Sequence, residues 1–330
     1  MALGRPAVDH PPRGTSPRIA DVARAGFGRL EQRRVAADTP AMPAETGANM
    51  TVQELFIKDP PRSVAGWASL FDPSRLPVLA DTADTLEELR EHEDAVDARM
   101  LADAIVTDPL MTLKVLAHVA QLRRGREGSD SETVTEALVM IGIPTFFRAF
   151  GAQSVAEDRL ASLPEALAGF QRVLRRSHRA ARFAIGFAVH RMDHDAPVIH
   201  GAALLHDFAE LLIWLHAPAL ALEIERRQQA DASLRSAAVQ RDVLNIELAE
   251  LQHALMTAWH LPGLLVQISD DHARAVTPQV RNVMLAIRVA RHSADGWTNA
   301  ALPDDLQEIG ALLQLGPEPT ARLLQEIDTD

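Results

Sequence analysis

The chain has 330 residues, 47% of them apolar, and its 45 acidic residues outnumber its 33 Lys and Arg residues, so the net charge is −12. It has no Cys, which excludes disulfides, thiolate metal sites, iron–sulfur clusters and a cysteine nucleophile. A chain of this length buries roughly three-quarters of its unfolded surface and needs no covalent staple. The acidic balance argues against broad binding to nucleic acid or to anionic membranes.

Residues 1–49 differ in composition from the rest of the chain. They contain seven Arg, no Lys and five acidic residues, so they carry +2 while residues 50–330 carry −14. Such a Pro- and Gly-rich segment buries too little apolar surface to fold, and we expect a disordered extension. Two alternatives stay open. The segment forms a basic amphipathic helix that touches a membrane or an acidic partner, or the protein starts at Met50 and the segment is not translated.

The N-terminus lacks the short apolar core of a secretory signal. The most apolar stretch, Leu211–Leu222, is interrupted by His216 and Pro218. It is also shorter than the roughly 20 residues that a membrane-spanning helix needs. We therefore expect a cytoplasmic protein.

From about residue 74 the apolar residues recur at helical spacing almost everywhere, which predicts an all-α fold. Asp108 and Pro109 pair an N-cap with a proline at the first helical position. No alternating strand pattern of useful length, internal repeat or heptad run is present. The predicted helices cover residues 81–91, 95–107, 109–122, 131–142, 164–192, 197–215, 217–229, 237–257, 262–270 and 278–294, with two short helices after Pro303 and Pro317.

The sequence has no phosphate-binding loop, dinucleotide-binding glycine fingerprint, G-x-S-x-G elbow or H-E-x-x-H motif. Its 13 His residues are therefore the first candidates for chemistry.

Two His-Asp pairs stand out among them. His194 and Asp195 lie in the polar break MDHDAP, which is typical of a solvated loop, whereas His206 and Asp207 lie among small and apolar residues. Neighbouring helical side chains project about 100° apart, so this second pair can flank one point beside the helix. Imidazole and carboxylate suit Zn, Fe, Mn or Ni. A buried Asp needs a partner, so Asp207 requires a metal, an Arg or a helix end.

His178 is the third candidate ligand, because it borders an apolar stripe and should face inward. His200 shares a helical face with Asp207 and is more typical of a core histidine. An arginine stripe surrounds His178; it either holds a phosphate or pairs with Asp207, or it is a solvated helix face with ion pairs. The stripe consists of Arg172, Arg175, Arg176, Arg179 and Arg182.

Several segments, in this order, resemble the HDOD domains, which are HD-related output domains of bacterial signalling proteins. SRLPVLADTADTL resembles the opening segment, and TDPLMTLKVL with TEALVMIGIPTF resembles the first half of the domain. RRSHRAARFA resembles the helix of the first His, HGAALLHDFAELL the His-Asp segment, and AWHLP with DDHAR the segments that follow. The resemblance covers about residues 74–295 and implies a multi-helix, HD-superfamily-like bundle.

The resemblance also implies a division of the chain. Residues 50–73 form a short N-terminal segment, and residues 74–300 form the HDOD domain. Within that domain we expect a helical subdomain at about 74–160 and the HD-like bundle at about 161–300. Residues 301–330 supply short C-terminal helices.

The parent HD superfamily comprises metal-dependent phosphohydrolases with ligands in the order His, His-Asp, Asp. By resemblance, His178, His206 and Asp207 correspond to the first three ligands. The position of the closing Asp falls on Arg291, whose guanidinium repels a cation. Asp295, one turn further on, is a possible substitute in a different register.

Other positions depart from the enzymes as well. A further His is expected eleven residues before Trp259, where the chain has Leu248. Ala209 and Glu210 replace the Gly and the basic residue of the enzymes' HD-x-G-K motif. DDHAR retains His272 but has Asp271 in place of its neighbouring His. These departures favour a protein that keeps the bundle and has lost the chemistry.

The leading hypothesis is therefore a non-catalytic regulatory protein that acts in signal transduction by binding a protein partner and uses no cofactor. Under it, His206 and Asp207 are core polar residues, paired with each other or with Arg182 or Arg291.

The alternative is a divergent phosphohydrolase acting on a nucleotide or cyclic dinucleotide with Fe, Mn, Zn or Ni. His178, His206 and Asp207 would then bind the metal, with Asp271, His272 or Asp295 completing the site. A third hypothesis is a ligand sensor in which arginines hold an anion or a partner. The candidates for that role are Arg175, Arg179, Arg182 and Arg291.

Overall fold

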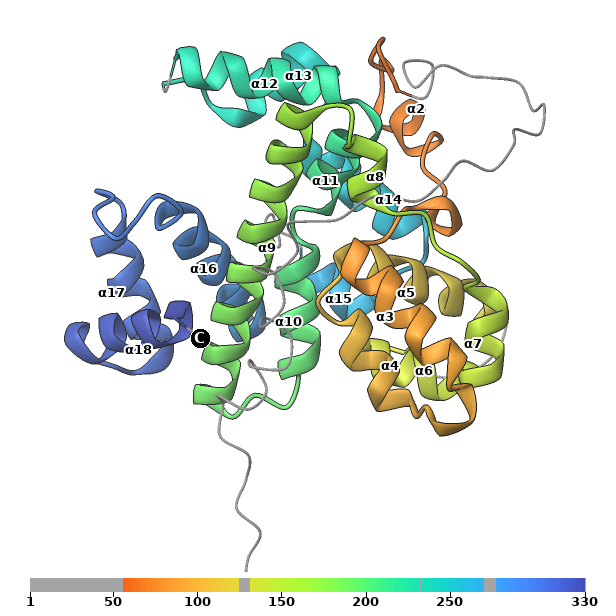
Figure 1. Cartoon of the computed structure of the whole chain (residues 1–330). Helices are drawn as coiled ribbons and strands as arrows, with labels where there is room; N and C mark the ends of the chain where they lie inside the picture. The colour runs from red at the N-terminus through yellow and green to blue at the C-terminus, as the bar shows by residue number, and fades with distance from the viewer. Residues whose placement is uncertain (1–55, 125–130, 232, 270–276, 330) are drawn as a thin grey trace, which may run out of the picture. The chain divides into compact units, whose positions relative to one another are not determined.

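A computed structural model of the chain describes residues 56–124, 131–231, 233–269 and 277–329. These residues form α-helices and short 3-10 turns with no named strand among them (Figure 1), which confirms the predicted all-α class. The expected extension 1–49 and the alternative start at Met50 lie outside the described residues.

The helices follow one another closely along the chain. Their bounds are α2 Val64–Ala68, α3 Ala80–Glu91, α4 Ala98–Ile105, α5 Pro109–Arg123, α6 Val134–Ile141, α7 Ile143–Ala149, α8 Ala156–Leu160, α9 Pro164–Arg191, α10 Ala196–Leu205, α11 Phe208–His216, α12 Pro218–Ala230, α13 Ser236–Leu244, α14 Leu248–Ala258, α15 Gly263–Ile268, α16 Pro278–His292, α17 Leu302–Leu313 and α18 Pro317–Thr329, with 3-10 turns η2 Pro73–Arg75 and η3 Glu93–Ala95. The sequence pattern did not predict α2, α7 or α8, which are too short to show a clear period.

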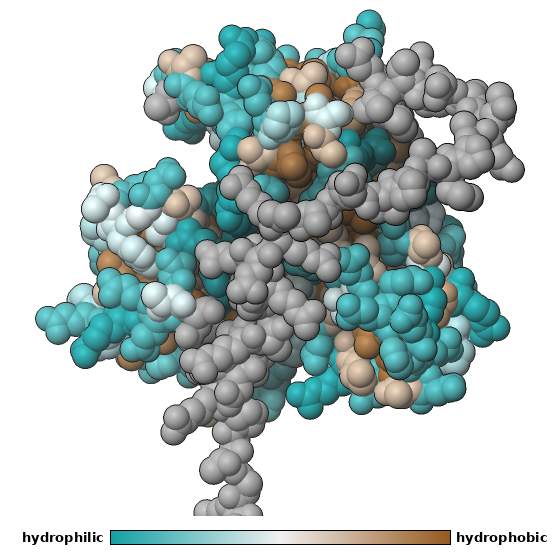
Figure 2. Space-filling model, in the orientation of Figure 1, coloured by the Kyte–Doolittle hydropathy of each residue, from teal (hydrophilic) through white to brown (hydrophobic). Residues whose placement is uncertain are grey.

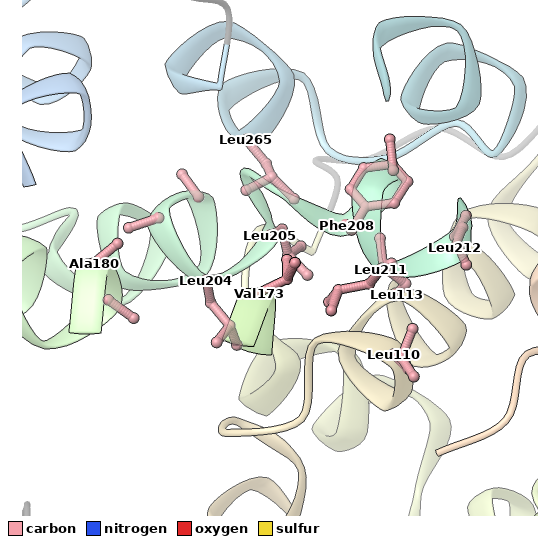
Figure 3. Packing of buried hydrophobic residues seen from close by; sticks show 14 of the residues in the cluster. Leu110, Leu113, Val173, Ala180, Leu204, Leu205, Phe208, Leu211, Leu212 and Leu265 are labelled. Carbon is pink, nitrogen blue, oxygen red and sulfur yellow. The ribbon is translucent and has the colours of Figure 1, made fainter. Parts of the chain in front are cut away.

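The long helix α9 packs along α10 and α16 (Figure 1). Small side chains on its buried face let the neighbouring helices approach closely. At Gly169, an added Cβ would lie 2.3 Å from Cη2 of Trp214 on α11, so the indole takes the space of a side chain. The apolar cluster beneath α9 draws on α5, α10, α11 and α15 (Figure 3). It includes Leu110, Leu113, Val173, Leu204, Leu205, Phe208, Leu211 and Leu265.

Asp108 ties the start of α5 to the start of α3. Its carboxylate accepts the predicted N-cap hydrogen bonds from the backbone N–H groups of Leu110 and Met111, at 2.8 and 3.0 Å. It also accepts a 2.8 Å bond from the N–H of Leu79, which precedes α3. The side chain is fully buried, and burial raises the pKa of Asp108 despite these bonds.

Two predicted helices are each broken in two. Residues 197–215 form α10 and α11, with His206 and Asp207 at the break. Residues 237–257 form α13 and α14, separated at Asn245, whose φ of 63° is left-handed. The prediction was wrong at both places because the apolar residues continue on either side of each break, and Asn tolerates the left-handed conformation.

The segment Ala196–His216 is, within the described ranges, the one stretch long and apolar enough to cross a membrane. Of its most apolar window, 78% is buried inside the protein, as is usual for core helices of globular domains. The visible surface of the described helices is largely hydrophilic, with small apolar areas between polar ones (Figure 2).

The C-terminal helices α17 and α18 are joined to α9 and α16 by polar contacts. Asp305 on α17 is fully buried and accepts hydrogen bonds from Arg288 and His292 of α16. Asp328 on α18 pairs with Arg179 of α9 at 2.8 Å. These helices lie beyond the segments that carried the family resemblance.

Candidate functional site

The His-Asp pair lies where α10 ends and α11 begins. His206 is the C-cap of α10 and Asp207 the residue before α11. Nδ1 of His206 lies 3.0 Å from Oδ1 of Asp207, so the two side chains contact each other as well as adjoining in sequence.

Two arginines from distant helices meet the carboxylate of Asp207. Arg176 of α9 donates from Nε to Oδ2 at 2.7 Å, and Arg291 of α16 donates from Nη2 to Oδ1 at 2.9 Å. Each carboxylate oxygen therefore has its own guanidinium partner. We call the group formed by Arg176, His206, Asp207, Glu210 and Arg291 the Asp207 cluster.

Glu210 completes the charge balance of this cluster. It lies in the first turn of α11 and accepts a 2.6 Å hydrogen bond from Nη2 of Arg176. The fork of Arg176 thus bridges two carboxylates, and two arginines balance two acids. Charge-assisted bonds of this kind are about twice as strong as neutral ones.

The electrostatics follow from burial and charge together. Burial alone would raise the pKa of Asp207, but the charges of Arg176 and Arg291 and the contact with His206 outweigh it. They hold the pKa of Asp207 well below its usual range. Burial would likewise lower the pKa of Arg176, and the two carboxylates raise it instead. Asp207 is therefore ionised at all ordinary pH values.

The side chains around Asp207 do not fit the metal ion that the HD superfamily implies. A cation needs the carboxylate oxygens and uncharged or anionic ligands around them, whereas two guanidinium groups hold both oxygens of Asp207. Among the residues that the structure describes, no group of three or more His, Asp or Glu side chains is placed to hold a metal ion.

His178, the third ligand that the resemblance implies, makes a contact of its own. Its Nε2 lies 2.7 Å from the backbone oxygen of Thr107, in the turn between α4 and α5. Positions 176 and 178 project 200° apart on a helix, so they lie on opposite edges of the buried sector of α9. Arg176, not His178, is on the edge that faces Asp207.

The surroundings of His178 are those of a core histidine. Burial is the main reason that its pKa is lowered, with the charge of Arg182 adding to the effect. The nearby His200 is more deeply buried, and burial together with His178 lowers its pKa to about 4. Both rings are therefore neutral near pH 7, as expected for buried imidazoles.

The remaining predicted residues are dispersed. Arg179 binds Asp328, the backbone oxygen of Ala290 and the hydroxyl of Ser293. Arg182 is partly buried beside His178, while Arg175 and Asp295 are exposed. Asp271 and His272 lie outside the described residues. Of the four arginines expected to hold an anion or a partner, Arg291 is the one that contacts Asp207.

Arg176 and its second partner, Glu210, belong to the site; sequence reasoning offered Arg176 only as one of five arginines that could pair with Asp207, and it gave Glu210 no partner. The sequence signal for Arg176 was that a buried Asp207 requires a partner. The arginine stripe around His178 contained several side chains that could supply it. Periodicity did not choose among them, because Arg176 and His178 flank the same apolar stripe.

Comparisons with known proteins agree with this architecture. The sequence profile of the HDOD domain matches residues 76–275. The MmoQ response regulator from Methylococcus capsulatus is 23% identical, with a TM-score of 0.56, over 76% of this chain and 98% of that one. A virulence factor from Campylobacter jejuni is 16% identical, with a TM-score of 0.52, over 72% of this chain and 85% of that one.

At these identities the two structures support the fold alone. No curated protein matches the sequence. The family profile, however, spans well over half of the chain, and it includes the His-Asp pair, Arg176 and the helices that hold them. The chain therefore belongs to the HDOD domain family.

Proposed function

We propose that this protein is a non-catalytic regulator in signal transduction, which uses its HDOD bundle to bind a protein partner. The observation that carries the proposal is the pairing of Asp207 with Arg176 and Arg291. These two positive side chains form ion pairs with both oxygens of the carboxylate that a phosphohydrolase would use to bind its metal.

Membership of the HDOD family supports the signalling role. The similar protein MmoQ is called a response regulator, which agrees with that role. Under this proposal the Asp207 cluster connects α9, α11 and α16, and its role is to hold the bundle together. The partner binds elsewhere on the surface.

Elemental analysis of protein purified without chelator tests the proposal, together with hydrolysis assays on nucleotides and cyclic dinucleotides. We expect metal far below one equivalent and no turnover. Near-stoichiometric Fe, Mn, Zn or Ni that is lost in His206→Ala would contradict the proposal, as would turnover that is lost in the same variant.

A gain-of-binding experiment sharpens this test. The double variant Arg176→His, Arg291→Asp removes both guanidinium groups from Asp207 and supplies two metal-ligand types in their place. Calorimetric titration with Mn²⁺ or Zn²⁺ is expected to show binding in the double variant and none in the wild type. Arg288→Gln is the control, because it changes an arginine of the same helix that faces Asp305 instead and adds no metal ligand there.

A further inference from the structure

An open cavity lies apart from the Asp207 cluster. Its volume is about 680 Å³, and it lies between η2, α5, the segment joining α7 to α8, and the turn after α14. No member of the Asp207 cluster lines it. Cavities that bind small molecules typically have about 300–1,000 Å³. This cavity is therefore of a size to hold one.

One face of α5 forms a wall of this cavity. Lys114, His118 and Gln121 follow one another at helical spacing along that face, and Arg124 comes next at the end of the helix. From Pro109 to Ala117 the rest of α5 is packed in the apolar core. The helix therefore presents a polar, basic stripe to the cavity, and its other side chains are buried over most of its length but exposed at Leu122 near its end.

Lys114 is the most unusual residue of this stripe. The chain has two lysines, and this one is only 5% exposed. Its Nζ donates to the backbone oxygen of Leu76 at 2.7 Å and to Oε1 of Gln153 at 2.5 Å. An ammonium group has three donors. Two are committed to these acceptors, and the cavity lies beside the group.

The cavity is positive although the protein is acidic. Arg75, Lys114 and Arg124 line it against one acid, Asp72, so its fixed charge is 3 − 1 = +2, with His118 and His260 taken as neutral. The carboxylate of Asp72 already accepts hydrogen bonds from the N–H and hydroxyl of Ser74, at 2.9 and 2.7 Å. A concave site of one sign attracts ions of the opposite charge.

Another part of the cavity lining is a strained turn. His260 follows Trp259 with a left-handed φ of 54°. Its N–H and that of Leu261 bond back to Thr257 and Met256, the pattern of a helix C-cap that usually places Gly at this position. A non-glycine residue is strained in that conformation. In this chain it adds an imidazole to the cavity lining.

We propose that this cavity binds a phosphorylated small molecule of mononucleotide size, with Arg75, Lys114 and Arg124 as the partners of its phosphate. A phosphate monoester carries about −1.5 to −2 charges at pH 7, which matches the fixed charge of the lining. The volume exceeds what inorganic phosphate needs, so an organic group fills the rest, beside Phe150, Trp259 and His260.

This inference does not rest on the proposed function, since none of its residues belongs to the Asp207 cluster. The small-molecule ligand is proposed in addition to the protein partner, and its binding does not depend on the state of the Asp207 cluster. It also places the anion away from the arginines around His178, where the sequence suggested it. Arg176 and Arg179 of that stripe are already paired with carboxylates.

Isothermal titration calorimetry of the full chain with AMP, GMP, CMP and UMP tests the proposal, with inorganic phosphate and adenosine as comparison probes. We expect saturable one-to-one binding of at least one nucleotide, weaker binding of phosphate and none of adenosine. No binding of any of the nucleotides would overturn the proposal. Equal affinity for nucleotide and inorganic phosphate, or binding of adenosine by itself, would do so too.

Variants assign the binding to this cavity. Arg75→Ala removes an exposed cation and is expected to weaken binding about tenfold or more, as the loss of a charged hydrogen bond implies. Gln121→Glu places a negative charge on the α5 face and should weaken binding at least as much. Lys114→Met should abolish it. Because this buried residue also supports the fold, the two exposed variants keep the test decisive if Lys114→Met is unstable.

Arg148→Ala is the matched control. Arg148 is an exposed arginine of α7 that does not line the cavity, so its removal changes the net charge equally. Affinity in this variant should stay at the wild-type value. Equal weakening in Arg148→Ala and Arg75→Ala would show that net charge alone attracts the nucleotide, and would overturn the site.

The pH dependence provides a second readout. Burial lowers the pKa of Lys114 to about 8, against the smaller opposing effect of Asp108. The ammonium is therefore lost as the pH rises from 7 to 9, and nucleotide affinity should fall over that range. Affinity that stays constant from pH 7 to 9 would exclude Lys114 from the site.

Discussion

Two buried aspartates, one inside the family-matched bundle and one beyond it, are held in similar ways. Asp207 is paired with Arg176, Arg291 and His206, and Asp305 with Arg288 and His292. Helix α16 contributes to both clusters, because its Arg291 contacts Asp207 while its Arg288 and His292 contact Asp305. A His beside a buried Asp is thus part of an arginine–carboxylate cluster in this protein, and the His-Asp sequence motif alone does not indicate a metal site.

The two clusters differ in how deeply the partners are buried. Beside Asp207, Arg176 is 23% and His206 10% exposed, while Arg291 is 47% exposed; beside Asp305, Arg288 is 37% and His292 35% exposed. When the carboxylate is removed, a partner side chain near the surface is hydrated by water instead. A guanidinium that is more deeply buried is not hydrated in this way. The bundle should therefore depend on its aspartate more than the C-terminal helices depend on theirs.

Asp207→Ala should have the largest effect. Removing one partner of a buried ion pair costs about 3–5 kcal/mol of unfolding free energy, since it leaves charge without compensation. Urea denaturation followed by circular dichroism measures this loss. A loss below about 1 kcal/mol would mean that Arg176 and Arg291 find other partners, as exposed pairs do.

Asp305→Ala should cost less, about 1.5–3 kcal/mol, the usual value for hydrogen bonds to a charged group. Its arginine and histidine regain water on the outer side of α16. The same denaturation experiment compares the two variants directly. If Asp305→Ala costs more than Asp207→Ala, partner exposure does not control the energetics of these clusters.

Gly169→Ala compares packing in the same two regions. The added Cβ would meet the indole of Trp214 at 2.3 Å, and overpacking of a buried site typically costs about 1–3 kcal/mol. Gly186→Ala is the matched control. There the nearest atom, at 2.5 Å, is the terminal Cδ1 of Ile327 on α18, which can rotate away. Thermal unfolding should show a clear loss for the first variant and a small change for the second.

The smallest effect is expected from mild acid. The pKa of Asp207 is lower in the folded protein than in the unfolded chain, so its stabilising contribution is present above the unfolded pKa and is lost as the pH falls toward the folded value. The stability difference between wild type and Asp207→Asn should be constant from pH 7 to 5. It should shrink by about 0.4 kcal/mol at pH 3.9, where half of the unfolded carboxyls are protonated. A difference that grows on acidification would contradict the lowered pKa.

Local sequence signals predicted much of the fold. The N-cap of Asp108 with Pro109, the extent of α3 and α9, and the two C-terminal helices all follow from capping residues and helical spacing. The breaks at His206–Asp207 and at Asn245 did not, because the apolar residues continue across them. A helix break of this kind depends on which neighbours pack against each half.

The candidate site divides in the same way. The sequence by itself determined an all-α HDOD chain, a buried Asp207 that needed a partner, and an arginine at position 291, where the family resemblance placed the closing acid of the enzymes. Only the tertiary structure decided that Arg176, and not His178, meets Asp207, and that one face of α5 lines a positive cavity. Periodicity gives the angle of a side chain around its own helix. The partner at that angle depends on how α9 packs against α10 and α16, which residues far apart in the sequence determine.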